Sequence, residues 1–425
     1  MHATWPEELT EVFDNSVTVE YTSLTRKGAP ICVPTTPYIG RDYSTLDVST
    51  GLTYPAKAER ARRNPKVCLL YADPIGSGLD SPPVIMVQGI AAVRDSDLQA
   101  NTDRYVSLTL SKLPEAYRGK PRVALRLMPW YFARIWIEIT PVKIYWWNGR
   151  SLVSQPQVYE VGDDIVLPVS DPAPQGHTPP PWIDPPASWE SSADLVVKDM
   201  EGCLCDLSVI GADGFPACLP VERVERNPEG FTLVVGSGAG ELLSSGDGPA
   251  CLTFHAHPGK FTSQQNRTFV GRLADRLTSR SMPESLVVDS SAQAPSEGTS
   301  IDVLGHATTG SADVSAETLL QRSLHPTPIS GRVPAPSPAS APVHSSLPDG
   351  AGGADASSGT SSGIRDSEVM VLSFQVDRAL GDWSLAGNQL SMSVDFLRKG
   401  LKLRPRLRTE LARRGQPVPK VRIRI

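Results

Sequence analysis

The sequence predicts a mainly β protein in which one small domain, a barrel or a sandwich, occurs twice in tandem. Three signals recur in the same order in both halves of the 425-residue chain: a Gly-x-Pro, a proline that opens an apolar run, and a glycine that ends a later run. They are Gly28-Ala29-Pro30, Pro65 and Gly89 in the first half, and Gly214-Phe215-Pro216, Pro249 and Gly271 in the second. Their spacings agree within two residues, which indicates a duplication.

Strand signals dominate the first copy, residues 1–158. The stretch 16–25 alternates and is rich in β-branched residues, and Arg26-Lys27-Gly28 then supplies a hairpin turn. Further strands are expected at 31–37, 67–71, 84–93 and 133–147, with another ending near Thr50, and short helices at 6–13, 55–63 and 97–113. Many short strands with few helices are typical of a small barrel or sandwich.

The rest of the chain divides by composition. Eight of the nineteen residues from Pro168 to Pro186 are proline, so 159–193 is expected to be a stiff linker. The second domain begins with 194–276, and the Ser/Ala/Pro/Gly-rich stretch 277–366 is expected to be a disordered insert. The stretch 374–378 resembles 137–143, so 367–425 is expected to hold the last strand of the second barrel. The alternative is an independent module at 369–425.

Composition excludes some classes of protein. A hydrophobic content of 40% is sufficient for packed cores, and no apolar run is long enough for a transmembrane helix. The acidic start, Met1 to Glu8, lacks the features of a signal peptide. The six cysteines form no Cys-x-x-Cys pair, and Cys203-x-Cys205 has the wrong spacing for a zinc knuckle. A cytoplasmic protein is therefore expected.

The C-terminal segment is strongly basic. Residues 397–425 carry eleven Lys or Arg against Glu410 alone, whereas the whole chain has a net charge of −5. Leucines are interleaved with these charges, at positions 401, 403, 407 and 411. This pattern favours an amphipathic helix that docks on the acidic body or borders an anionic ligand. A nucleic-acid arm is the less favoured alternative.

The segment before Pro65 has the composition of a phosphate site. Pro55 is suited to the first position of a helix, which places Lys57 in the first turn beside unpaired backbone N–H groups. Hydroxyls from Ser49 or Thr50 complete a set of groups that suits phosphate, with Arg60 one turn further along. The alternative is an exposed basic helix.

The second copy differs at this position. Alignment on Pro65 and Pro249 places Glu241 opposite Lys57, directly after the glycine-rich stretch 236–240. A carboxylate would repel phosphate, so the second copy is expected to hold a turn in a decayed site.

Several motifs together resemble the pyridoxamine 5'-phosphate oxidase-like, flavin-binding split β-barrel family. They are Gly28-x-Pro30, Ser49-Thr50 before Tyr54-Pro55-Ala56-Lys57, Arg63-Asn64-Pro65-Lys66-Val67, the strand ending at Gly89, and the stretch Pro141 to Arg150. The resemblance covers residues 12–152 well and 200–275 more loosely. It implies two tandem split β-barrels that form an intramolecular pseudo-dimer around one working groove.

The same resemblance implies a cofactor and its contacts. FMN would lie in the groove, its phosphate held by Lys57 and Thr50, with Thr35 or Thr36 near the flavin ring or ribityl chain. Trp147 would lie near the cofactor, and Arg150 would be a further contact. The usual Ser-Arg before the lysine is Pro55-Ala56 here, so one cationic phosphate ligand is missing and a vitamin B6 reaction is in doubt.

The function expected from the resemblance is hydride-transfer chemistry on an unidentified small molecule, for which the cofactor supplies the reactivity. F420 is an alternative cofactor, whose acidic tail Arg60, Arg62 and Arg63 could receive. A non-enzymatic cofactor-binding or regulatory protein, monomeric or homodimeric, is the alternative from another class. No catalytic acid or base and no metal site are predicted. His255-x-His257 would place two imidazoles on one strand face, but no third ligand lies nearby in the sequence.

Overall fold

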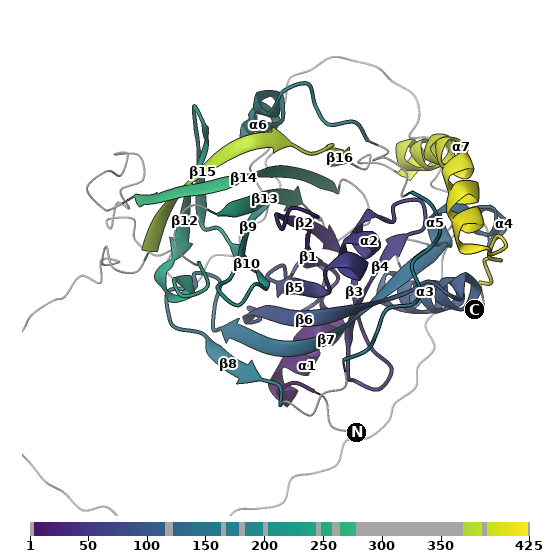
Figure 1. Ribbon diagram of the computed structural model, residues 1–425, viewed down its shortest axis with the longest axis horizontal. Coiled ribbons are helices and arrows are strands. Elements are labelled where there is room, and N and C mark those ends of the chain that lie inside the picture. Colours follow the sequence, from purple (N-terminus) through teal and green to yellow (C-terminus); the bar gives the residue numbers. More distant parts are fainter. Residues whose placement is uncertain are drawn as a thin grey trace, which may run out of the picture. The chain divides into compact units, whose positions relative to one another are not determined.

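The computed structural model describes residues 4–114, 122–162, 167–177, 183–198, 203–243, 248–256, 264–277, 369–384 and 389–423. All of them belong to one compact unit. Two curled antiparallel sheets of eight strands each, with a few short helices, form this unit (Figure 1). The predicted fold class, mainly β with two split barrels, is confirmed. The expected insert at 277–366 lies outside the described residues apart from Leu277.

The first sheet is built from residues 19–160. Its path is β2-β1-β5-β6-β7-β4-β3, and β8 pairs with β7. The strands are β1 (Val19–Leu24), β2 (Pro30–Thr35), β3 (Pro37–Ile39), β4 (Leu46–Gly51), β5 (Lys66–Tyr71), β6 (Val84–Arg94), β7 (Arg134–Trp147) and β8 (Gln157–Glu160). Alternate residues of β7, among them Ile135, Ile137 and Ile139, fill the barrel core, as the two-residue period of a strand requires.

Short helices flank this sheet. They are η1 (Glu7–Leu9), α1 (Thr10–Asn15), α2 (Ala56–Arg63), α3 (Leu98–Lys112), α4 (Arg122–Arg126) and α5 (Pro129–Phe132). The helix expected at 6–13 is instead a 3-10 turn followed by α1, because the chain turns tightly after Pro6. Asp97 caps α3 by accepting a hydrogen bond from the N–H of Ala100 at 2.9 Å.

The second sheet repeats the first strand by strand. Its path is β10-β9-β13-β14-β15-β12-β11, and β16 pairs with β14. The elements are α6 (Trp189–Lys198), β9 (Leu204–Ile210), β10 (Pro216–Pro220), β11 (Arg223–Asn227), β12 (Gly230–Gly236), η3 (Ser237–Ala239), β13 (Pro249–Ala256), β14 (Gln265–Leu277), β15 (Val369–Ala379) and β16 (Trp383–Ser384). Strand β15 occupies the position that β7 has in the first sheet, so the second barrel is completed from beyond residue 368.

The two barrels meet along a seam at which β1, β2 and β5 contact β9, β10 and β13. Equivalent residues touch each other there. Thr22 Oγ1 lies 3.0 Å from Ser208 Oγ, and Cys32 Sγ lies 3.9 Å from Cys218 Sγ. Each pair is 186 positions apart, so a pseudo-two-fold axis passes through the seam. One hydrophobic core is shared by both sheets across it.

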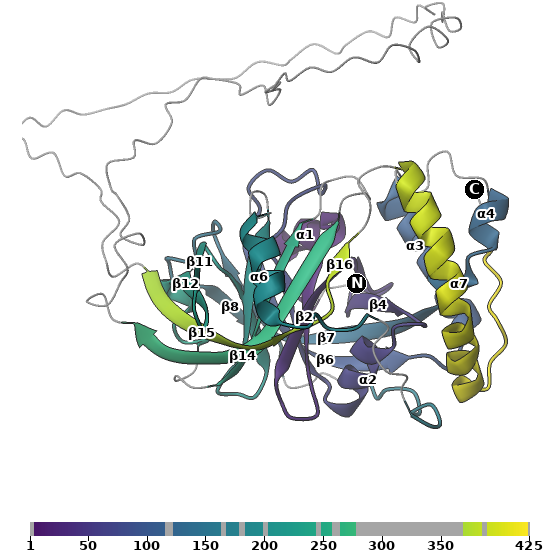
Figure 2. The same cartoon turned by 90° about the horizontal axis from the view of Figure 1, so that it is seen from above.

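The basic C-terminal segment forms α7 (Gln389–Arg414), which lies along the helices of the first half (Figure 2). Leu403, Leu407 and Leu411 are buried in the core of the first barrel, whereas Leu401 is exposed. In the part of the chain that the structure describes, no helix combines the length and apolar character required to span a membrane.

Candidate functional site

The cations of the predicted site are positioned by the turn between β4 and α2. The N–H of Tyr54 donates to the carbonyl of Gly51 at 2.8 Å, and α2 starts at Ala56 directly after the buried Pro55. Ala58 and Ala61 of α2 are buried in the barrel core. Lys57 and Arg60 therefore project from the rest of the helix surface, both of them half-buried.

Lys57 is surrounded by other cations. Burial, together with the positive charges of Arg134 and Arg60, lowers the pKa of Lys57 from 10.5 to about 7. Among the residues that the structure describes, none makes a hydrogen bond or an ion pair with the Lys57 ammonium. An anion bound beside it would relieve this repulsion.

Neutral groups hold the two arginines in place. Arg60 Nε donates to Ser23 Oγ at 2.9 Å. Arg134 Nη2 donates to the hydroxyl of Tyr105 at 2.7 Å, and its guanidinium lies 3.9 Å from the centre of that ring. These contacts orient the two guanidinium groups beside Lys57.

The predicted hydroxyls lie around the same strand ends. Gly51 pairs with Arg134 in register, so Ser49, two residues earlier on β4, shares a sheet face with Arg134. Thr35 Oγ1 donates to the carbonyl of Ser49 at 3.5 Å. Thr50 Oγ1 donates to the carbonyl of Tyr54 at 2.8 Å and so holds the turn before α2. Thr36, directly after β2, is half-buried.

Trp147 and Arg150 lie elsewhere. Trp147 ends β7, whereas Arg134 begins it, so the length of the strand separates them. The Trp147 side chain is 1% exposed and packs in the core shared by the two barrels. Arg150 Nη1 donates to the carbonyl of Ala72 at 3.4 Å. Trp147 and Arg150 therefore lie at the end of β7 opposite to Arg134.

The second copy differs at the corresponding position. In the described residues the short η3 follows β12, where α2 follows β4 in the first copy, and Glu241 is exposed. A Cβ on Gly236 or Gly238 would overlap the backbone of residues 151–154. The N–H of Gly238 donates to the carbonyl of Leu152 at 2.9 Å. These two glycines thus admit a neighbouring segment of the chain.

No family model matches the sequence, and no curated protein matches it. General Stress Protein 26 from Bacillus anthracis str. Sterne is 19% identical and is matched over 36% of this chain and 96% of its own, with a TM-score of 0.24. A pyridoxamine 5'-phosphate oxidase-related, FMN binding protein from Nostoc punctiforme PCC 73102 is 18% identical. It is matched over 37% of this chain and 87% of its own, with a TM-score of 0.26. An F420 reductase is 15% identical and is matched over 33% of this chain and 98% of its own, with a TM-score of 0.25. At such TM-scores the fold is assigned from the strand order of the two sheets.

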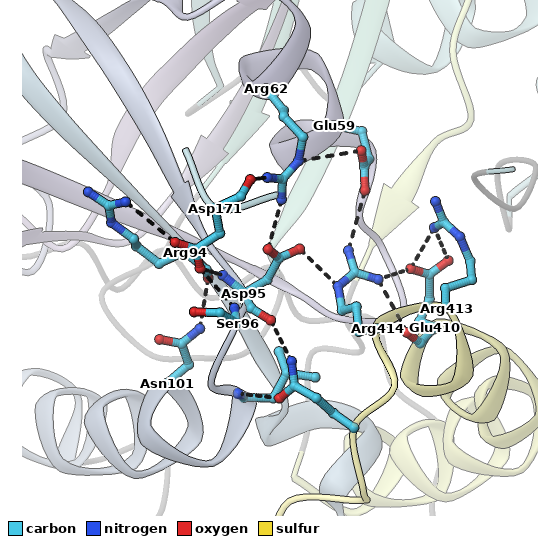
Figure 3. A network of polar contacts seen from close by, with 12 residues as sticks. Glu59, Arg62, Arg94, Asp95, Ser96, Asn101, Asp171, Glu410, Arg413 and Arg414 are labelled. Carbon is cyan, nitrogen blue, oxygen red and sulfur yellow. Dashed lines mark hydrogen bonds and ion pairs between the residues drawn. The ribbon is translucent and has the colours of Figure 1, made fainter. Parts of the chain in front are cut away.

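The opposite side of α2 is tied to α7 (Figure 3). Arg62 forms an ion pair with Asp95 at 2.8 Å, and Asp95 also pairs with Arg414 at 2.9 Å. Arg414 reaches Glu59 of α2 at 3.3 Å and pairs with the buried Glu410. Arg62, one of the arginines expected to receive the acidic tail of F420, is thus engaged in ion pairs with Asp95 and Glu59.

Two cations of this region are absent from the sequence-based site. Arg134 reaches Lys57 because β7 pairs with β4, the strand that leads into α2. Arg406 Nε donates to the carbonyl of Thr53 at 2.6 Å from α7. A charge at the first residue of a long apolar strand is the one signal that could have identified Arg134. Nothing local in the sequence relates Arg406 to Thr53.

Proposed function

We propose that this chain binds the phosphate of a flavin-type cofactor at Lys57, Arg60 and Arg134. FMN is the preferred cofactor and F420 is the alternative. The observation that carries the proposal is the convergence of these three cations. Burial, and next to it the charges of Arg134 and Arg60, lower the pKa of Lys57 to about 7. Clustered like charges that are partly removed from water are costly unless an anion compensates them.

The chemistry of the site fits a phosphate group. A phosphate dianion beside Lys57 would favour the charged ammonium, and the first N–H groups of α2 would add donors. The Ser49 hydroxyl shares the sheet face of Arg134 and could donate to the same group. Arg134 would supply the cationic ligand that is lacking at Pro55-Ala56.

The activity that we propose is hydride transfer to or from an unidentified small molecule. The bound cofactor supplies this redox chemistry, and the residues of this chain bind and orient the cofactor. A cytoplasmic location, expected from the sparse unpaired cysteines, belongs to the same proposal.

A non-enzymatic cofactor-binding or regulatory role is the second candidate. The observation that favours it is the second copy, in which residues 151–154 pass over the glycines where the first copy has its cations. A chain that has lost one site can also have lost turnover. Steady-state reduction or oxidation of the bound cofactor separates the two functions.

The test is a titration of the full-length protein with FMN, riboflavin and F420, followed by absorbance and fluorescence. Lys57→Glu is expected to weaken FMN binding by about 100-fold, since a charged hydrogen bond of about 1.5–3 kcal/mol is replaced by repulsion. Arg134→Met should weaken FMN binding in the same direction and leave riboflavin binding nearly unchanged. Lys27→Glu, the same charge change on the exposed hairpin turn, is the matched control. Failure to bind FMN or F420, or equal binding by Lys57→Glu, would refute the proposal.

A further inference from the structure

A second polar cluster lies at the seam, away from the cation site. Glu20 of β1, Asp206 of β9 and His255 of β13 meet there, and their side chains are at most 1% exposed. His255 Nε2 lies 2.8 Å from Asp206 Oδ2 and 3.2 Å from Glu20 Oε1. One ligand atom from each residue falls within 4.8 Å of the other two.

We propose that Glu20, Asp206 and His255 bind one divalent metal ion, Zn²⁺, which joins the two barrels at their seam.

The geometry of the three ligand atoms suits a small metal ion. Bonds of about 2.0–2.1 Å to a tetrahedral Zn²⁺ place neighbouring ligand atoms about 3.3 Å apart. The two measured separations from His255 Nε2 are near this value. The other carboxylate oxygens, Glu20 Oε2 and Asp206 Oδ1, are buried and receive no hydrogen bond from the residues that the structure describes. They remain available to the metal or to a water molecule in the fourth position.

The charge of the cluster also favours a cation. Two carboxylates face one imidazole in a region without solvent contact, and removing carboxylates from water is costly unless positive charge compensates them. A third carboxylate, Asp73, lies close enough to act electrostatically on both His255 and Asp206. Arg150 also acts electrostatically on Asp73. A divalent ion would neutralise the excess negative charge.

The pseudo-two-fold axis explains how the cluster arises. Thr22 and Ser208 are equivalent residues that touch across the seam, and Glu20 and Asp206 each lie two positions earlier on the same strands. The duplication therefore brings two carboxylates together. Only the second barrel supplies an imidazole. In the first barrel the residue that corresponds to His255 is Ala72, directly after β5.

The sequence alone did not predict a metal site at His255, because no third ligand lies nearby in the chain. The missing ligands come from strands far away in the sequence, and Asp206 is 49 positions from His255. The neighbouring His257 lies outside the described residues. The set of one imidazole and two carboxylates suits Zn²⁺ or a similar first-row ion, and burial on three rigid strands indicates a structural role.

The test measures the metal content of full-length protein produced in zinc-supplemented medium without a histidine tag. About one Zn²⁺ per chain is expected to remain after gel filtration, and chelation during unfolding and refolding should lower Tm. His255→Ala, Asp206→Asn and Glu20→Gln should each lose most of the metal. His177→Ala, which removes an exposed imidazole, should retain it, and so should Lys57→Glu, which alters only the proposed phosphate site.

Three results would overturn the proposal. Folded wild-type protein without metal, and with the same Tm after chelation, would show that protons alone neutralise the cluster. Full metal content in folded His255→Ala and Asp206→Asn would place the ion elsewhere. Replacement by Co²⁺ gives a further check, since a thiolate-to-cobalt charge-transfer band would assign the ion to Cys32 and Cys218 at the same seam.

Discussion

Lys57→Met is expected to stabilise the folded protein at neutral pH, because the wild-type ammonium is partly removed from water and lies beside Arg60 and Arg134. The pKa of Lys57 is about 7 in the folded chain against an ordinary value of 10.5. This difference corresponds to at most about 5 kcal/mol. Lys57 is only half-buried, and solvent screening reduces the expected gain to about 2 kcal/mol.

The sign of the effect sets its pH dependence. Between pH 7 and 10.5 the unfolded wild-type chain binds more protons at Lys57 than the folded chain does, so wild-type stability rises with pH in this window. The methionine variant lacks this contribution. Its advantage should be complete below about pH 7 and should disappear as the pH approaches 10.5.

Urea unfolding at several pH values measures the effect, with Lys27→Met as the control for loss of an exposed lysine. The control should differ from wild type by less than about 0.5 kcal/mol at every pH. A Lys57→Met variant that is no more stable than wild type at pH 7 would refute the reasoning. An advantage that does not change with pH would refute it as well, since it would then come from packing.

Two further substitutions test how the site is supported, each followed by thermal unfolding. Gly238→Ala should destabilise the protein by about 3 kcal/mol or more, because the new Cβ would overlap the carbonyl of Ser154, whereas Gly248→Ala meets nothing within 4 Å and should be nearly neutral. Equal Tm values for these two variants would contradict the close approach of residues 151–154. Asp95→Ala should cost about 3–5 kcal/mol, because it removes a shared partner of Arg62 and Arg414, whereas Asp80→Ala removes an exposed carboxylate. A small effect of Asp95→Ala would mean that Glu59 and Glu410 suffice to compensate both guanidinium groups.

Local signals in the sequence were sufficient for six of the eight strands of the first sheet and for α2, but not for the short β3 and β8. The expected helix at 55–63 and the observed Ala56–Arg63 differ by one residue, because prolines mark both ends of the segment. The strand order of the second sheet follows from the duplication. Each of these features depends on residues close together in the chain or on repetition of a spacing.

The parts that were not predicted depend on long-range contacts. Arg134 joins the cation site only through the pairing of β7 with β4. Glu20 and Asp206 meet only because the two barrels pack about a pseudo-two-fold axis. In the sequence each is one polar residue within a strand of alternating polar and apolar residues. No local pattern therefore distinguishes them.

The position of β15 has a consequence for synthesis of the chain. The first sheet is complete once Glu160 has been made. In the second sheet, the edges of β12 and β14 that pair with β15 stay open until Val369 and the residues after it emerge. About 90 residues separate β14 from β15, which corresponds to roughly 5–20 s of translation at 5–20 residues per second. During that interval the ribosome carries an unfinished sheet with open edges. Helix α7, which covers the first barrel, is synthesised later still. Early termination anywhere before Val369 would therefore release a chain prone to aggregation.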